Sequence, residues 1–230
     1  YLLPLTEMLV QSGNEADAVF MKRYMKGQYE YFGIKSPMRR EIMKSFLTAY
    51  GMPPPGRLQE ITYDCWNLPQ REYQYFIMEV LGKMAKKADK SRIGLYEFLI
   101  INKSWWDTVD YLAPHLIGTH FRLFPELIPE TTGRWMNSGN LWLQRACLLF
   151  QLKYKGKTDP ELLTGFIRQL KGSQEFFINK AIGWILREYS KTDPAWVKGY
   201  VEENHADLAS LSKREALKWI ERRVYFEKMD

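Results

Sequence analysis

The sequence contains a repeated helical unit, which limits the folds that this chain can adopt. Segments that open a helix with an apolar face follow one another at intervals of 35, 36, 34, 34 and 38 residues, by subtraction of their first positions: Ser36, Arg71, Asp107, Leu141, Glu175 and Lys213. A period of this length holds two helices, and one helical pair cannot bury its apolar stripe without a stacked neighbour. The spacing predicts an all-α fold, an α-solenoid with a concave groove. The alternative is a helical bundle without repeats.

Local signals agree with helices, and strand signals are nearly absent. Capping residues precede proline in Ser36-Pro37, Thr158-Asp159-Pro160 and Thr192-Asp193-Pro194, an arrangement typical of helix starts. Glycines mark the expected helix ends or breaks at Gly33, Gly51, Gly82, Gly156 and Gly172. Since no long linker or low-complexity segment interrupts the pattern, we expect residues 1–230 to form a single domain.

The charge favours a polyanionic partner. Lys and Arg total 33 against 27 Asp and Glu, a formal net charge of +6, which suits nucleic acid or an anionic membrane. No apolar run reaches membrane-spanning length. The first residues lack the basic segment of a signal peptide and meet Glu7 early. We therefore expect a cytoplasmic protein without a membrane partner.

Metal and cofactor signals are weak. Cys65 and Cys147 are far apart among apolar residues, which indicates two reduced core thiols. His115, His120 and His205 have no Cys or His partner at zinc-site spacing. We expect no metal and no cofactor.

Residues 104–110 are the most informative stretch. Ser104 has the character of a helix N-cap, and Asp107 follows three residues later, where an acid can reach back to the cap amide. Asp110 lacks such a structural explanation, since it lies past the first turn among apolar residues. Trp106 precedes it by four residues and shares its helix face. A carboxylate beside an indole suits a cationic ligand, and the open alternative is an ion pair between Asp110 and an Arg of the next repeat.

Two more Trp and Arg pairs fall at equivalent places of later repeats. Trp142 and Arg145 are three residues apart, as are Trp184 and Arg187. Such an Arg can hold a phosphate while the ring covers a sugar or base, although a single pair is more often a core Trp with a solvated Arg. Free N–H groups at the helix start of Ser36 could also bind phosphate. Basic residues that could line the same groove are Lys35, Arg39, Arg40, Lys153, Lys155 and Lys191.

With these residues in view, the sequence resembles the bacterial AlkD-type DNA alkylation repair glycosylases over nearly the whole chain. The resemblance is strongest in four stretches: residues 22–26 (KRYMK), 104–110 (SWWDTVD), 142–146 (WLQRA) and 180–189 (KAIGWILREY). Several long matches in the same order are more specific than one short motif.

The resemblance implies an α-solenoid of about six HEAT-like repeats whose concave basic groove holds duplex DNA. It implies the removal of cationic N3- and N7-alkylated purines, such as 7-methylguanine, without metal, cofactor or base flipping. Asp110 matches the catalytic aspartate, Trp106 and Trp184 match two groove tryptophans, and Arg145 matches a phosphate-contacting arginine. Tyr24 matches a tyrosine near the lesion, and Arg187 matches a basic position of the DNA-binding face.

The sequence thus predicts a DNA-alkylpurine N-glycosylase, a hydrolase of base excision repair. Its partner would be double-stranded DNA containing alkylated purines, bound by a monomer at the bacterial nucleoid. The predicted DNA-binding residues are Tyr24, Lys35, Ser36, Arg145, Lys153, Arg187 and Lys191. Two alternatives remain open, a HEAT-repeat DNA-binding protein without catalysis and a protein-binding scaffold, the commonest use of such arrays.

Overall fold

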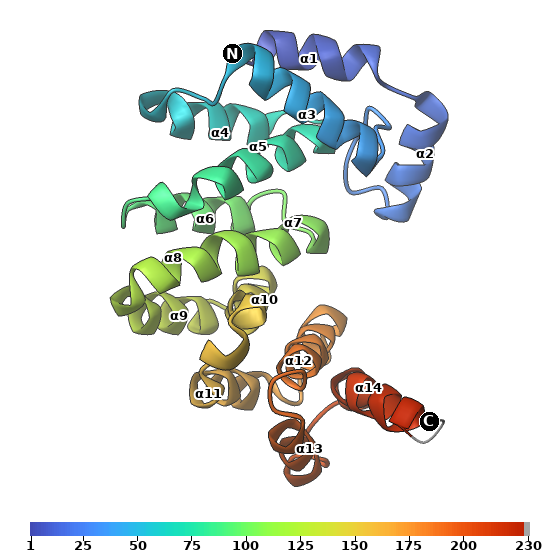
Figure 1. The fold of residues 1–230 in the computed structure, drawn as a ribbon, viewed down its shortest axis with the longest axis vertical. Helices are drawn as coiled ribbons and strands as arrows, with labels where there is room; N and C mark the ends of the chain where they lie inside the picture. Colours follow the sequence, from blue (N-terminus) through green and yellow to red (C-terminus); the bar gives the residue numbers. More distant parts are fainter. Residues whose placement is uncertain (228–230) are drawn as a thin grey trace. The chain divides into compact units, whose positions relative to one another are not determined.

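The computed structural model describes residues 1–227, with side chains up to residue 223, and this part of the chain is all-α (Figure 1). Within this range the only strand-like pairing is an isolated parallel bridge between Glu30 and Gln70. The prediction of an all-α fold is confirmed. No helix in the described range has the length and apolarity to cross a bilayer.

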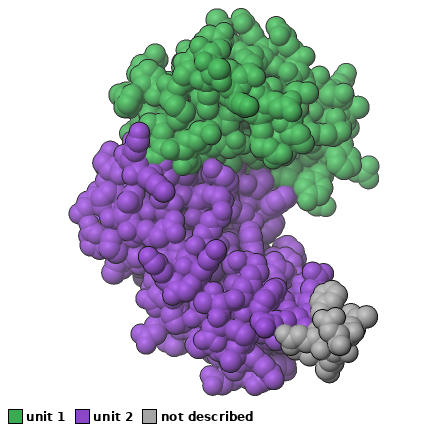
Figure 2. Space-filling view, viewed as in Figure 1, with its two compact units in different colours: residues 1–84 green, residues 85–230 purple. Residues whose placement is uncertain are grey.

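The chain divides into two compact units, Tyr1–Met84 and Ala85–Asp230 (Figure 2). Unit 1 contains a 3₁₀ turn, Pro55–Arg57, and the helices α1 (Leu2–Gln11), α2 (Glu15–Tyr24), α3 (Ser36–Tyr50), α4 (Leu58–Asn67) and α5 (Arg71–Met84). Its core is apolar and aromatic. The ring of Phe46 on α3 meets the ring of Phe76 on α5 edge-on at 5.3 Å between centroids, and Cys65 is a buried free thiol as expected.

A buried carboxylate fixes the entry to α3. Glu72 on α5 accepts hydrogen bonds from three consecutive backbone amides, those of Phe32, Gly33 and Ile34, at 3.0–3.2 Å. Gly33 has φ 84°, and a Cβ there would lie 2.0 Å from the carbonyl oxygen of Asn14, so the position requires glycine. The loop before α3 is therefore held from within unit 1.

Unit 2 is also built from short helices. They are α6 (Arg92–Ile101), α7 (Trp106–Tyr111), α8 (Gly118–Leu123), α9 (Ile128–Asn137), α10 (Leu141–Leu149), α11 (Pro160–Leu170), α12 (Phe176–Tyr189), α13 (Pro194–Glu203) and α14 (Ser210–Glu227). Short 3₁₀ turns cover Ala85–Lys87, Pro125–Leu127, Phe150–Lys153 and Lys155–Lys157. Cys147 on α10 is a buried free thiol.

The N-termini of α3, α11 and α13 show which of the predicted capping residues act as N-caps. Asp159 and Asp193 are N-caps of α11 and α13, and each side chain accepts a hydrogen bond of 2.9 Å from a first-turn amide. Ser36 is not a cap, because α3 begins at Ser36 itself, with Lys35 as the N-cap residue and no side-chain hydrogen bond. Gly51 closes α3 with φ 72°, as expected of a helix-terminating glycine.

A π-helix, Leu112–Ile117, joins α7 to α8 without a break. Pro114 has no N–H to donate to the carbonyl of Asp110, and the hydrogen bonds shift by one residue, as in the bond from Gly118 N–H to the Ala113 carbonyl. At Gly118 a Cβ would lie 2.3 Å from the carbonyl oxygen of Phe150. Close packing therefore holds this irregular helix in place and fixes the turn that carries Asp110.

Candidate functional site

Asp110 on α7 is paired with Arg145 on α10 in a two-pronged ion pair. The Nε of Arg145 donates to Oδ1 of Asp110 at 2.8 Å, and its Nη2 donates to Oδ2 at 2.9 Å. The remaining Nη1 donates to the backbone carbonyl of Phe177 on α12. Parallel N–H···O bonds of this kind are strong and geometrically demanding, so Arg145 fixes the carboxylate and ties three helices together.

The pairing shows what the guanidinium of Arg145 does inside the protein. Its side chain is only 3% exposed, whereas that of Asp110 is 19% exposed. Three of its five N–H groups bond within the protein, and the phosphate contact predicted for Arg145 stays a prediction. The pairing of Asp110 with an arginine of the next repeat, left open by the sequence, is the arrangement found.

The carboxylate of Asp110 keeps capacity for a ligand. Burial raises the pKa of the Asp110 carboxyl above its ordinary value, the bonds from Arg145 oppose that rise, and the charge of Asp107 adds to it. Each oxygen of an ionised carboxylate can accept more than one hydrogen bond, and Arg145 uses one on each. The exposed edge of Asp110 is therefore open to a cation or a water molecule.

An aromatic cluster lies beside this ion pair. The rings of Trp105, Trp142 and Phe177 are 5.1–5.7 Å apart between centroids, and the guanidinium of Arg145 lies 5.8 Å from the Phe177 ring. Trp142 thus packs into a cluster, the more ordinary of its two predicted roles. Trp105 was missed because no charged residue lies three or four positions from it, and Phe177 because it lies in the apolar run Phe176–Ile178.

The two predicted groove tryptophans are both partly exposed. Trp106 lies one helical turn before Asp110 on α7, and Trp184 lies two turns after Phe177 on α12. Residues at these spacings share one side of a helix. Their catalytic roles remain predictions.

The prediction of Ser104 as the N-cap of α7 is wrong. The N-cap residue is Trp105, whose side chain makes no capping hydrogen bond. The hydroxyl of Ser104 instead donates back to the carbonyl of Ile100 at the end of α6, at 2.5 Å. Asp107 lies in the first turn of α7, where its charge is favourable to the helix dipole.

The predicted DNA-binding cations lie in both units. Lys35 pairs with Asp17 at 2.8 Å, Arg187 with Glu215 at 2.6 Å and Lys191 with Glu188 at 2.6 Å. The Lys35 and Lys191 pairs lie at the surface, where ion pairs contribute little to stability, whereas Glu215 is buried. The remaining predicted residues Tyr24, Ser36 and Lys153 are exposed; Tyr24, Lys35 and Ser36 belong to unit 1, and the other predicted site residues belong to unit 2.

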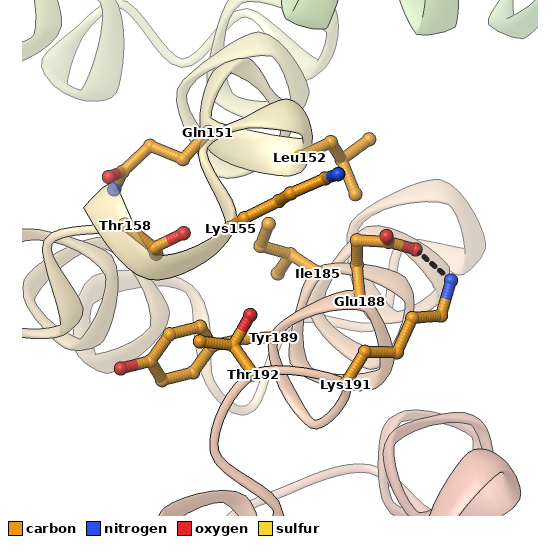
Figure 3. A pocket seen from close by; sticks show the side chains of 9 residues that line it. All are labelled: Gln151, Leu152, Lys155, Thr158, Ile185, Glu188, Tyr189, Lys191 and Thr192. Atoms are coloured by element: carbon orange, nitrogen blue, oxygen red, sulfur yellow. Dashed lines mark hydrogen bonds and ion pairs between the residues drawn. The ribbon is translucent and has the colours of Figure 1, made fainter.

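A concavity of about 290 Å³ lies between the turns that follow α10 and the end of α12 (Figure 3). Lys155 and Lys191 line it together with Glu188, and Figure 3 shows the Glu188–Lys191 ion pair at its side. Two of the predicted basic residues therefore gather at one place. Among residues 1–227, no three His, Cys, Asp or Glu side chains group as they would around a metal ion.

Comparisons with known proteins place this all-helical chain among DNA repair proteins. The sequence profile of the family described as "DNA alkylation repair enzyme" matches residues 5–220. A solved structure, "Predicted DNA alkylation repair enzyme from Enterococcus faecalis", is 31% identical, with a TM-score of 0.82 over 90% of this chain and 96% of that chain. No curated protein matches the sequence. The chain belongs to the DNA alkylation repair enzyme family.

Proposed function

We propose that this protein is a DNA glycosylase that excises cationic N3- and N7-alkylated purines from duplex DNA. The observation that carries the proposal is the carboxylate of Asp110, which Arg145 holds rigidly while one edge stays exposed. A fixed negative charge is what a reaction that develops positive charge on a sugar requires. Family membership supports the DNA substrate.

The chemistry follows from the charge of the lesion. Alkylation at N7 leaves the purine cationic, so the electron pair of the breaking C1′–N bond neutralises the departing base. Positive charge then develops on the deoxyribose, and the Asp110 carboxylate stabilises this oxocarbenium-like state. Water adds to C1′ and gives up a proton, which Asp110 or solvent takes. Trp106 and Trp184 pack beside the lesion and add cation–π stabilisation.

In this mechanism Arg145 is a positioning residue, because its buried guanidinium donates to both oxygens of the acid. The base stays in the stack, without the flipping used by most glycosylases. Uncharged lesions are then poor substrates, because nothing activates a neutral base. The duplex is held by Tyr24, Lys35, Ser36, Lys153, Arg187 and Lys191 in a cytoplasmic, nucleoid-associated monomer, with neither metal nor cofactor.

The finer architecture that we infer is a single domain, an α-solenoid of about six HEAT-like repeats with a basic concave groove. Six side chains spaced at the repeat period support this architecture. Each lies 36 or 35 residues after the one before it, by subtraction: Arg39, Tyr75, Asp110, Arg145, Lys180 and Glu215. Three pairs of successive members are in contact. Arg39 lies 4.2 Å from the Tyr75 ring centroid, and Asp110 pairs with Arg145 as Lys180 pairs with Glu215.

The central test is Asp110→Asn in a base-release assay on a duplex oligonucleotide carrying 7-methylguanine. The amide keeps the shape of the side chain and removes its charge, so we expect free-base release to fall at least a hundredfold. Binding to undamaged duplex should change less than threefold, which controls for folding. Near-normal release by the variant would remove Asp110 from the central role.

The second candidate is a duplex-binding protein without catalysis. The ion pair itself favours it, because the charge of Asp110 is already partly neutralised by Arg145. This candidate predicts binding to alkylated duplex with no free base released by the wild-type protein. The same assay therefore decides between the two.

A further inference from the structure

Glu215 on α14 joins two cations of α12. Its Oε1 lies 2.8 Å from the Nζ of Lys180, and its Oε2 lies 2.6 Å from Nη1 of Arg187. The Glu215 side chain is 9% exposed, against 37% for Lys180 and 27% for Arg187. The carboxylate therefore lies beneath the cations, which are the groups that face solvent.

Backbone packing keeps Glu215 in this place. Helix α12 packs along α14 (Figure 1), and at Gly183 a Cβ would lie 2.6 Å from the Cβ of Glu215. One turn away, the hydroxyl of Ser212 donates to the carbonyl of Asn179 at 2.8 Å. Because α12 and α14 approach this closely, Glu215 cannot move away from beneath the two cations unless the two helices separate.

The two cations flank Trp184. Lys180 lies four residues before it and Arg187 three residues after it, so all three share one side of α12. The pKa of Glu215 is held below its ordinary value, by the hydrogen bond and charge of Lys180 and then by the charge of Arg187. Glu215 is thus ionised at neutral pH, and the three side chains together carry a charge of +1.

We propose that Lys180 and Arg187 form a phosphate-binding pair and that Glu215 is its built-in counter-ion, which limits the affinity of this face for undamaged duplex. The inference rests on the proposed function, since it concerns the same DNA-binding surface. A phosphate that approaches the pair meets cations already half neutralised, so it releases fewer counterions on binding. A repair protein that examines much undamaged DNA needs this restraint, because phosphate contacts carry no information about the lesion.

The test is the salt dependence of binding to undamaged duplex, measured by fluorescence anisotropy for the wild type and Glu215→Gln. The neutral side chain adds one net positive charge at the pair, so the slope of log K against log salt should steepen by about 0.9. Affinity at low salt should rise several-fold. The matched control is Glu221→Gln, which makes the same change of net charge at an exposed position of α14. It should leave the slope unchanged.

Two further variants keep the test decisive if Glu215→Gln folds poorly. Lys180→Met and Arg187→Met each remove one cation and should each make the slope shallower by about 0.9. A slope unchanged in either of them, or unchanged or shallower in a folded Glu215→Gln, overturns the counter-ion role. A wild-type protein that fails to bind duplex at all rejects the proposed function instead.

Discussion

Arg145 shows how one buried residue can fix the orientation of a candidate site residue. All of its hydrogen bonds run to Asp110 and to the Phe177 carbonyl, and its side chain is buried. A lysine keeps the charge but has no planar fork with which to hold both carboxylate oxygens. The orientation of Asp110 therefore depends on arginine.

We predict that Arg145→Lys lowers free-base release from a 7-methylguanine duplex at least tenfold, because Asp110 loses its fixed orientation. The free energy of unfolding should fall by about 1.5–3 kcal/mol, since hydrogen bonds to charged groups are lost in a buried place. The salt slope of duplex binding should not change, because lysine keeps the positive charge. Unchanged free-base release by Arg145→Lys would contradict the positioning role.

Among single residues, the sequence singled out Asp110 and left open whether it faces a cationic ligand or pairs with an arginine. The partner lies 35 residues on, at the repeat period, so an alignment of the repeats by charge could have identified it. The Ser104 cap could not be excluded from the sequence, because its hydroxyl bonds back to Ile100 of the preceding helix. Trp105 takes the cap position with an extended backbone, at φ −157° and ψ 166°.

At the scale of elements, the contact between α12 and α14 depends on one small residue. A Cβ at Gly183 would lie 2.6 Å from Glu215 Cβ and 2.8 Å from the Ser212 carbonyl oxygen. Neither neighbour is the end of a flexible side chain, so the helices must move apart to admit a methyl group. The sequence showed this glycine inside an apolar helix, but not what it approaches.

We predict that Gly183→Ala lowers the free energy of unfolding by about 1–3 kcal/mol, the usual cost of overpacking, despite the better helix propensity of alanine. The matched control is Gly199→Ala in the middle of α13, where a Cβ meets nothing within 4 Å. That variant should be neutral or more stable by up to about 1 kcal/mol. Urea unfolding of both measures the difference, and equal stabilities would show that the helices separate without cost.

Element boundaries were predicted less well than element type. The apolar period gave helices throughout, yet the continuity of α7, the π-helix and α8 through Pro114 was not foreseen. A proline inside a helix normally ends it. Here the close approach of Gly118 to Phe150 holds the helix together across the proline, and such tertiary packing leaves no local signal in the sequence.

At the scale of the whole molecule, the all-α class followed from the period, but the division at Met84 and Ala85 did not. No change of composition marks that boundary, which falls between a helix and a short 3₁₀ turn. The basic excess is likewise a property of the whole chain. It favours polyanions, and it also makes the folded state sensitive to acid, because protonated carboxylates leave the cations without partners.

The pH dependence of stability follows from two kinds of carboxyl group, those whose pKa is lowered in the folded protein and those whose pKa is raised. Hydrogen bonds from Arg134 lower the pKa of Glu97, and Lys180 with Arg187 lower that of Glu215. A lowered folded-state pKa gives stability that is present above the ordinary value of 4.5 and is lost as pH falls through the folded value. For Asp110, whose pKa is raised by burial, protonation favours the folded state, so it opposes the loss. Carboxyls with a lowered pKa outnumber the one with a raised pKa, since Glu60, Asp89 and Glu126 are lowered as well. We therefore predict that the urea concentration at the unfolding midpoint falls as the pH drops below about 4.5. Glu97→Gln should flatten this fall, because a neutral amide gains no proton. A midpoint that rises on acidification would mean that the burial of Asp110, and not the ion pairs of Glu97 and Glu215, dominates the linkage.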